Sequence, residues 1–208
     1  MLSITHLRSY FFSSIALTLS LGGFSNAAVA SEQTAVFAGG CFWGVDAVFK
    51  HVKGVTKVVS GYSGGGAATA HYEQVSNGNT GHAEAVEIRF DPEKVSYQQL
   101  LQVFFTVAHN PTQLNFQGPD VGTQYRSAIF YTSSEQETTA QKYIQEQSSK
   151  QTFDAPIATQ VVALQQFYPA EEHHQNYLEL HPYQPYIVFN DQPKVAQLHE
   201  LFPSLFKP

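Results

Sequence analysis

The single cysteine of this 208-residue chain, Cys41, is the side chain best suited to nucleophilic or redox chemistry. It follows Gly39 and Gly40, and from Phe42 onward apolar residues recur at helical spacing. We therefore expect the thiol at the first turn of a helix, where the helix dipole would lower its pKa below the usual value of about 8.5. The alternative is a buried structural cysteine, the usual role of a lone one.

Glu84 is the second candidate, as a proton donor. Residues 82–90 alternate in polarity, and counting along this strand places Glu84 on the side of Val86, Ile88 and Phe90. A carboxyl group at the end of an apolar row is partly desolvated, so its pKa should rise and it could act as an acid near neutral pH. The alternative is that a bulge or the start of the strand turns Glu84 toward solvent.

Other residue patterns exclude several kinds of site. His82-x-Glu84 could place two metal ligands on one strand face, but neither His71 nor His173-His174 stands at a recognised spacing from it, so we expect no metal. The glycines at 64–66 lack the lysine and hydroxyl residue of a phosphate loop, and we expect a flexible active-site loop there. A formal net charge of −6 argues against a nucleic-acid partner.

The elements that must position Cys41 and Glu84 follow from the hydrophobic pattern. Two capping boxes, Ser96 with Gln99 and Ser134 with Glu137, each open a helix. We see no repeat and no linker, so we expect one α+β domain, a two-layer arrangement in which a mixed central sheet packs against helices. The expected strands lie at 34–38, 55–62, 82–90, 127–131 and 160–164, and the expected helices start at 42 and 96 and span 134–149 and 171–180.

Residues 1–30 have the pattern of a secretory signal peptide. Arg8 precedes an apolar run from Tyr10 to Phe24, and small residues end at Ala28-Val29-Ala30. We expect cleavage after Ala30, leaving a domain of residues 31–208 that is periplasmic or secreted and has no membrane attachment. The alternative is an uncut anchor, but the run is shorter than the roughly 20 residues that a spanning helix needs.

Five blocks of sequence together resemble the A-type peptide methionine sulfoxide reductases. They follow in the order and spacing of that family over most of residues 34–180, so the chain is identified as a member from the sequence. The blocks are GCFWG at 40–44, GYSGG at 61–65, YEQV at 72–75 with TGHAEAV at 80–86, DVGTQYRS at 120–127 and HQNYL at 174–178.

The resemblance implies a role for each catalytic residue. Cys41 would attack the sulfur of methionine-S-sulfoxide, free or in a protein, and become a sulfenic acid. Glu84 would protonate the departing oxygen, which is a poor leaving group otherwise. Tyr72 and Tyr125 would donate hydrogen bonds to the sulfoxide oxygen. The enzyme would repair oxidised proteins, with no metal, flavin or nucleotide as cofactor.

The resemblance also implies which residues bind the substrate. Phe42 and Trp43 would form an apolar pocket for the methyl group of the substrate. Asp120 would lie near the site and help to orient a tyrosine and the substrate. We expect a monomer.

The chain departs from many relatives in how it would be regenerated. Such relatives close a disulfide from a second, often C-terminal, cysteine, but the tail of this chain, 181–208, has none, and position 76 is Ser76. The sulfenic acid must then be reduced by an external thiol. Thioredoxin, glutaredoxin with glutathione, or dithiothreitol could supply it.

Two other functions stay open at this point. One is a binding protein that recognises oxidised methionine without turnover, because it lacks a resolving thiol. The other is a Cys-His acyl-transfer enzyme in which His71 or His82 is the base.

Overall fold

The computed structural model describes Met1 and residues 31–208, and the predicted signal peptide falls almost wholly outside these described residues. A six-stranded sheet forms the centre of the fold, in the order β7-β6-β1-β3-β2-β8. Every neighbouring pair is antiparallel except β6 and β7, which are parallel, so the predicted mixed sheet is confirmed. The strands are β1 (Gln33–Gly39), β2 (Val55–Ser63), β3 (Ala83–Phe90), β6 (Ser127–Tyr131), β7 (Gln160–Ala163) and β8 (Phe167–Pro169).

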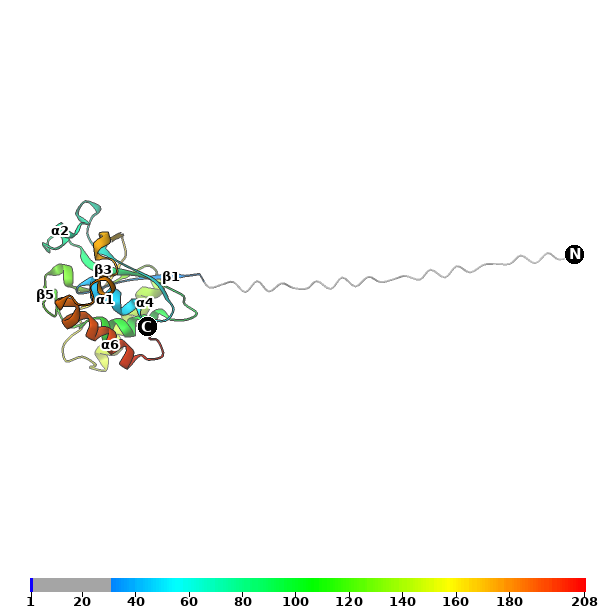
Figure 1. Ribbon diagram of the computed structural model, residues 1–208. Coiled ribbons are helices and arrows are strands. Elements are labelled where there is room, and N and C mark those ends of the chain that lie inside the picture. Colours follow the sequence, from blue (N-terminus) through cyan, green and yellow to red (C-terminus); the bar gives the residue numbers. More distant parts are fainter. Residues whose placement is uncertain (2–30) are drawn as a thin grey trace.

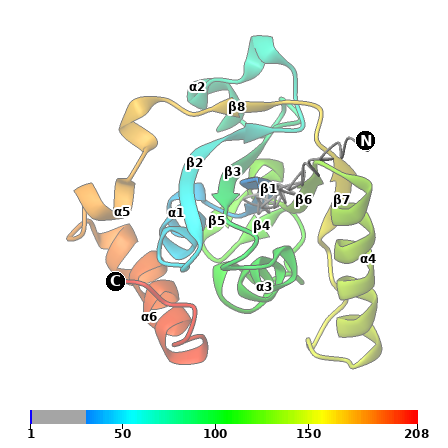
Figure 2. The same cartoon turned by 90° about the vertical axis from the view of Figure 1, so that its right-hand side faces the viewer.

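The larger hydrophobic core lies between one face of this sheet and the helices. Phe37, Val86 and Ile88 of the sheet are fully buried there, and the helices that pack on them surround this face (Figures 1 and 2). The core-packing helices are α1 (Phe42–Lys50), α3 (Tyr97–Val103), α4 (Ser134–Ser149) and α6 (Gln192–Leu201). The α+β class is therefore confirmed, with sheet and helices as two layers.

The opposite face of the sheet carries a smaller cluster built largely from alanines and two phenylalanines, Phe130 and Phe167. Small side chains alternate there with the large ones of the main core, because successive residues of a strand point to opposite faces. On β3 this alternation places Ala83 and Ala85 in the small cluster and Val86 in the large one.

Short elements complete the chain, and several of them were not predicted. A hairpin of β4 (Phe116–Gln117) and β5 (Asp120–Val121) precedes the 3-10 turn η3 (Thr123–Tyr125), and α2 (Tyr72–Val75) follows the 3-10 turn η1 (Ala67–Thr69). The π-helical turns η2 (Phe104–Ala108) and η5 (Ile187–Asp191) extend α3 and precede α6. The C-terminal segment is thus helical, a feature that its proline and tyrosine content did not suggest.

Two predicted helices differ in detail from the structure. The expected helix at 171–180 is divided into the 3-10 turn η4 (Glu172–His174) and α5 (Tyr177–Leu180), because Asn176 between them adopts a left-handed conformation with φ of 55°. The N-cap of α4 is Ser133, whose hydroxyl accepts the backbone N–H of Gln136 at 3.2 Å, so the capping box assigned to Ser134 was wrong by one residue.

Among the described residues, none of the helices has the length and apolar character needed to cross a bilayer.

Candidate active site around Cys41

Cys41 is the N-cap residue of α1, directly after strand β1, as predicted. Gly40 makes this sharp turn possible because its φ is +92°, a conformation that disfavours a side chain. A Cβ atom at Gly40 would also lie 2.5 Å from the side chain of Gln117. The thiol is 9% exposed. The strand, turn and helix therefore hold one thiol at the end of the sheet, almost out of contact with solvent.

The prediction that the pKa of Cys41 is lowered was wrong for the protein without substrate. Burial raises this pKa well above its ordinary value, and the negative charges of Glu84, once it ionises, and of Asp191 raise it further. The backbone N–H of Trp43 acts in the opposite direction but does not outweigh them. A helix N-terminus stabilises an anion only modestly, so desolvation and the surrounding carboxyl groups decide the result. The resting residue is a neutral thiol.

Glu84 lies on β3 and is 2% exposed, so the alternative of a solvent-facing side chain is excluded. Its Oε2 atom accepts the backbone N–H of Phe42, the first residue of α1, at 3.0 Å. Burial raises the pKa of this carboxyl to about 8, although the Phe42 hydrogen bond opposes the shift. The prediction of a raised pKa is confirmed. At neutral pH Glu84 holds a proton next to the first turn that carries Cys41.

Tyr72 and Tyr125 come from α2 and η3, on separate loops that approach the same site. Burial raises the pKa of both phenols, and the charges that Glu84 and Cys41 acquire at higher pH raise these pKa values further. Both hydroxyls therefore stay protonated at neutral pH and can donate hydrogen bonds. Glu171 fixes the start of α2, because its carboxylate accepts the Tyr72 backbone N–H at 2.9 Å and the Tyr62 hydroxyl at 2.8 Å.

Phe42 and Trp43 supply the aromatic part of the site. Phe42 is 1% exposed, and its ring lies 5.9 Å from that of Tyr62 and 6.5 Å from that of Trp43 between centroids. Trp43 is stacked on Tyr177 at 3.6 Å with the two planes only 4° apart. This packing holds the indole in one orientation beside Cys41 and gives the site an apolar wall.

Asp120 approaches from the hairpin β4–β5, but its recorded tyrosine partner is neither Tyr72 nor Tyr125. The Tyr186 hydroxyl donates a hydrogen bond to Asp120 Oδ2, and the Tyr186 ring meets Trp43 edge-on at 5.9 Å. Burial raises the pKa of Asp120, while Tyr186 and Lys194 lower it. The hairpin and the C-terminal segment are thereby joined across the site.

Sequence reasoning missed Tyr186 and Asp191 and weighed His174 only as a metal ligand. His174 is 3% exposed, packs 4.4 Å from Tyr72 and 5.2 Å from Phe42 between ring centroids, and neither of its ring nitrogens has a hydrogen-bond partner among the described residues. Asp191 is fully buried and pairs with Lys194 at 3.4 Å. Glycine at position 44 could have signalled this approach, because a Cβ atom there would lie 2.2 Å from Asp191 Oδ1.

His82 does not supply a base for Cys41. The ring of His82 lies against the glycine loop, where Nδ1 accepts the Gly65 N–H at 3.2 Å and Nε2 lies 3.0 Å from the Gly66 carbonyl oxygen. The Cys-His acyl-transfer alternative therefore lacks its base at His82. In the described part of the chain, no group of three or more His, Cys, Asp or Glu side chains could hold a metal ion.

Comparisons with known proteins identify the family to which this site belongs. Residues 33–204 match the family model described as peptide methionine sulfoxide reductase. The chain is 59% identical over 86% of its length to Peptide methionine sulfoxide reductase MsrA 2 of Mesorhizobium japonicum, of which it covers 92%. It is 49% identical over 83% of its length to Peptide methionine sulfoxide reductase MsrA of Trichodesmium erythraeum, of which it covers 97%.

Solved structures agree with this assignment. The crystal structure of reduced Mxr1 from Saccharomyces cerevisiae is similar with a TM-score of 0.70 and 32% identity, over 74% of this chain and 88% of that one. Methionine sulfoxide reductase A of Corynebacterium diphtheriae gives a TM-score of 0.65 at 32% identity, over 74% and 78%. The chain belongs to the peptide methionine sulfoxide reductase family and is an oxidoreductase that reduces methionine sulfoxide to methionine, which repairs oxidised proteins.

Proposed function

We propose that this chain is an exported, single-cysteine reductase of methionine-S-sulfoxide in which Cys41 is the nucleophile and Glu84 the proton donor. The observation that carries the proposal is the neutral Glu84 carboxyl, whose Oε2 is bonded to the Phe42 N–H immediately after Cys41. A buried acid beside a buried thiol supplies both groups that the reaction requires.

The reduction step balances with these two groups. The sulfur of Cys41 attacks the sulfoxide and takes over its oxygen, so that the substrate is reduced to the thioether and Cys41 is oxidised to a sulfenic acid. Glu84 protonates the sulfoxide oxygen as its bond to the substrate sulfur weakens, and the thiol proton of Cys41 returns to the Glu84 carboxylate. Because the resting thiol is neutral, the proton has to leave Cys41 during the reaction.

The remaining residues bind and polarise the substrate. Tyr72 and Tyr125 have protonated hydroxyls, which suits them to hold the sulfoxide oxygen. Phe42 and Trp43 offer an apolar surface that suits the methyl group of the substrate. Asp120 accepts a hydrogen bond from the Tyr186 hydroxyl and so supports the pocket only indirectly.

Regeneration requires a thiol from outside the chain, because the sequence contains one cysteine. One thiol condenses with the sulfenic acid to give a mixed disulfide and water, and a second thiol then releases the Cys41 thiol and a disulfide. Thioredoxin, glutaredoxin with glutathione, or dithiothreitol has the chemistry for both steps. No metal or organic cofactor takes part in this scheme, and the enzyme acts as a monomer.

An anaerobic incubation with separated sulfoxide epimers tests the proposal. We expect about one methionine per enzyme from the S epimer before any reductant is added, and repeated turnover once dithiothreitol is present. Release of more than one methionine without a thiol, or equal rates with the R epimer, would contradict it.

Export is tested separately. Intact mass measurement of the protein recovered from the extracytoplasmic fraction should give the chain that begins at Ser31. Recovery of the full-length chain from the cytoplasm would contradict export while leaving the chemistry of Cys41 untouched.

A further inference from the structure

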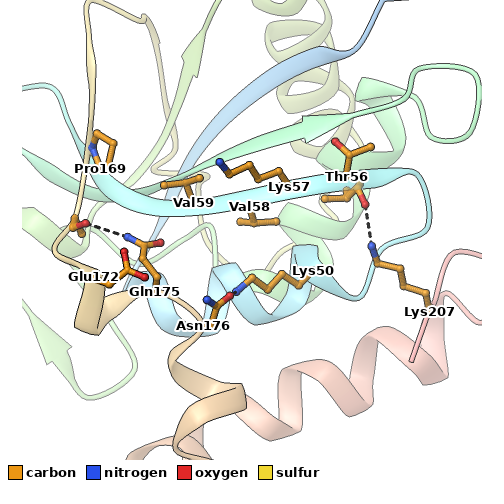
Figure 3. A pocket seen from close by; sticks show the side chains of 12 residues that line it. Lys50, Thr56, Lys57, Val58, Val59, Pro169, Glu172, Gln175, Asn176 and Lys207 are labelled. Atoms are coloured by element: carbon orange, nitrogen blue, oxygen red, sulfur yellow. Dashed lines mark hydrogen bonds between the residues drawn. The ribbon is translucent and has the colours of Figure 1, made fainter.

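A groove outside the active site runs along the free edge of strand β2. It has a volume of about 480 Å³ and lies between β2, the end of α1, the segment after β8 and the C-terminus of the chain (Figure 3). Its lining includes Lys50, Lys57, Val58, Glu172 and Lys207. None of these residues belongs to the constellation around Cys41.

The backbone of β2 is unpaired at this edge. Strand β8 pairs with β2 only from Gly61 to Ser63. At Ser60 the carbonyl accepts the backbone N–H of Ala170 at 2.9 Å and the side-chain amide of Gln175 at 2.9 Å. The amide oxygen of Gln175 accepts the Ser60 N–H at 2.9 Å, in the place of a further strand. At the other end, Lys207 Nζ donates to the Val55 carbonyl at 2.8 Å. The side chains of Gln175 and Lys207 therefore occupy the two ends of the free edge of β2.

Val58 lies between these two ends; its side chain is buried in the core, but no strand in the described part of the chain pairs with its backbone on the groove side. In an antiparallel ladder, residues alternate between facing one neighbouring strand and facing the other. Since the N–H and C=O of Ser60 face the groove, those of Val58, two residues away, face it as well. Among the described residues no hydrogen-bond partner is recorded for them on that side. An extended segment laid along β2 would complete these bonds.

The charges of the groove indicate what kind of segment fits. Lys50 is already paired with Asp46 at 2.8 Å. Lys57 is exposed and Lys207 is partly buried, and neither has a carboxylate within ion-pair distance among the described residues. Lys207 stands at one end of the groove, whereas the side chain of Lys57 extends along β2 toward Val59 (Figure 3). The lining also includes the carboxylate of Glu172, but the lysines outnumber it, so acidic side chains are complementary to the β2 side of the groove.

The groove and the active site share a wall, the 3-10 turn η4. His174 of η4 packs against Phe42 and Tyr72 in the active site, whereas Glu172 of the same turn and Gln175 just after it line the groove. A helical turn is roughly 10 Å across, a distance that about three residues of extended chain can span. A polypeptide that crosses η4 on the surface would therefore contact both places.

We propose that the β2 edge groove binds an extended, acidic segment of the oxidised polypeptide substrate, which adds to β2 at Val58 while its methionine sulfoxide occupies the site at Cys41. This inference rests on the reductase activity and names the polypeptide class that the enzyme reduces best. Free methionine sulfoxide does not reach the groove and serves as an internal control for the activity itself.

Steady-state kinetics with matched peptides test this. Each peptide carries one methionine sulfoxide and, about three residues away on its N- or C-terminal side, a segment in which Val or Thr alternates with either Glu or Gln. We expect a lower KM for a Glu peptide than for its Gln counterpart, with similar kcat. Lys57→Glu should raise the KM of the Glu peptide about three- to tenfold and leave the kinetics of free methionine sulfoxide unchanged.

Lys142→Glu is the matched control, because Lys142 is also exposed but lies on α4, away from the groove. It should not alter the KM of any peptide. N-methylation of alternate residues in the Glu segment removes backbone N–H donors without changing the charge. The methyl groups can occupy either of two alternating sets of residues, and the set that faces β2 should raise KM. The proposal would be overturned by a KM that depends neither on the Glu residues of the peptide nor on Lys57, or by an equally large effect of Lys142→Glu. Self-association of the enzyme that Lys57→Glu abolishes would also overturn it, because the groove would then bind a second copy of the chain. If the parent enzyme does not reduce free methionine sulfoxide, the proposed function itself is contradicted.

Discussion

At the scale of single residues, the site holds two protons that the reaction must move. The pKa of Glu84 is raised to about 8 and that of Cys41 is raised well above its ordinary value, both chiefly by burial. In the proposed mechanism the acid, Glu84, is therefore protonated at neutral pH, whereas the nucleophile, Cys41, has to lose its proton as the substrate binds and reacts. This division follows from burial of both groups, with the carboxyl groups of Glu84 and Asp191 raising the pKa of the thiol further.

Glu84→Gln should slow the single-turnover rate on the order of 100-fold, because the amide still accepts the Phe42 N–H but cannot supply the proton. In the parent enzyme only the protonated carboxyl is active, so the rate should fall as pH rises through about 8. Rapid-quench measurement of methionine formation from pH 6 to 9.5 checks both effects. An unchanged rate in Glu84→Gln would show that another group is the acid. So would a rate that falls above pH 8 in the variant as it does in the parent.

The same carboxyl affects stability. A carboxyl with a raised pKa in the folded state binds more protons there than in the unfolded chain, so the free energy of unfolding should decrease as pH rises from about 4.5 to about 8. Glu84→Gln removes this component. Its melting temperature relative to that of the parent should therefore increase between pH 5 and pH 8, and a constant difference would contradict the raised pKa of Glu84.

At the scale of elements, the first turn of α1 and the C-terminal segment are packed so closely that residue 44 must be glycine. A Cβ atom there would lie 2.2 Å from Asp191 Oδ1 and 2.7 Å from Lys194 Nζ. Gly44→Ala should displace η5 and with it Tyr186, lowering kcat/KM and destabilising the fold by about 1–3 kcal/mol. Urea unfolding and kinetics measure the two effects.

Gly66→Ala provides the control for Gly44→Ala, since no atom lies within 4 Å of a Cβ at Gly66. It should change neither activity nor stability by much. Equal effects of the two substitutions would mean that the contact with Asp191 and Lys194 is not what requires glycine.

The start of α4 gives a second test at this scale. Ser133 is the N-cap, and Ser134 is the first residue of the helix. Ser133→Ala should cost about 1 kcal/mol of unfolding free energy, whereas Ser134→Ala should cost little. Thermal or urea unfolding of the two variants measures this difference. A larger loss of stability in Ser134→Ala than in Ser133→Ala would show that Ser134 is the N-cap.

Local patterns were sufficient for the elements that carry Cys41 and Glu84. The glycine pair followed by helical spacing placed Cys41 at the start of α1, and strand alternation placed Glu84 on the buried face of β3. Both signals depend only on neighbouring residues, whose periodicity reports which face is buried. The division of the predicted helix at 171–180 was not visible, because it depends on the left-handed conformation of a single residue, Asn176.

At the scale of the whole molecule, contacts between residues far apart in the sequence form the part of the site that could not be predicted. Asp191 and Tyr186 reach the site from the C-terminal segment, well over 100 residues after Cys41, and no periodic pattern connects them to it. The sign of the Cys41 pKa shift depends on burial first and then on the carboxyl groups of Glu84 and Asp191, so helix position alone gave the wrong sign. Only the resemblance to the family brought Tyr72, Tyr125 and Asp120 into the predicted site.

The fold also agrees with the proposed dependence on an outside thiol. The segment that closes the site at its C-terminal side offers Tyr186, a fully buried Ile187 and Asp191, and none of these can attack a sulfenic acid to form a disulfide. Oxidised Cys41 must therefore persist until a reductant reaches it.

Mass spectrometry of the intact protein after one anaerobic turnover, followed by mapping of residue 41, tests the catalytic role of Cys41 most directly. We expect the protein to gain one oxygen atom, located on Cys41, in the same amount as the methionine released, and to lose it when dithiothreitol is added. Methionine formed while Cys41 remains unmodified, or full activity of Cys41→Ser, would contradict the account.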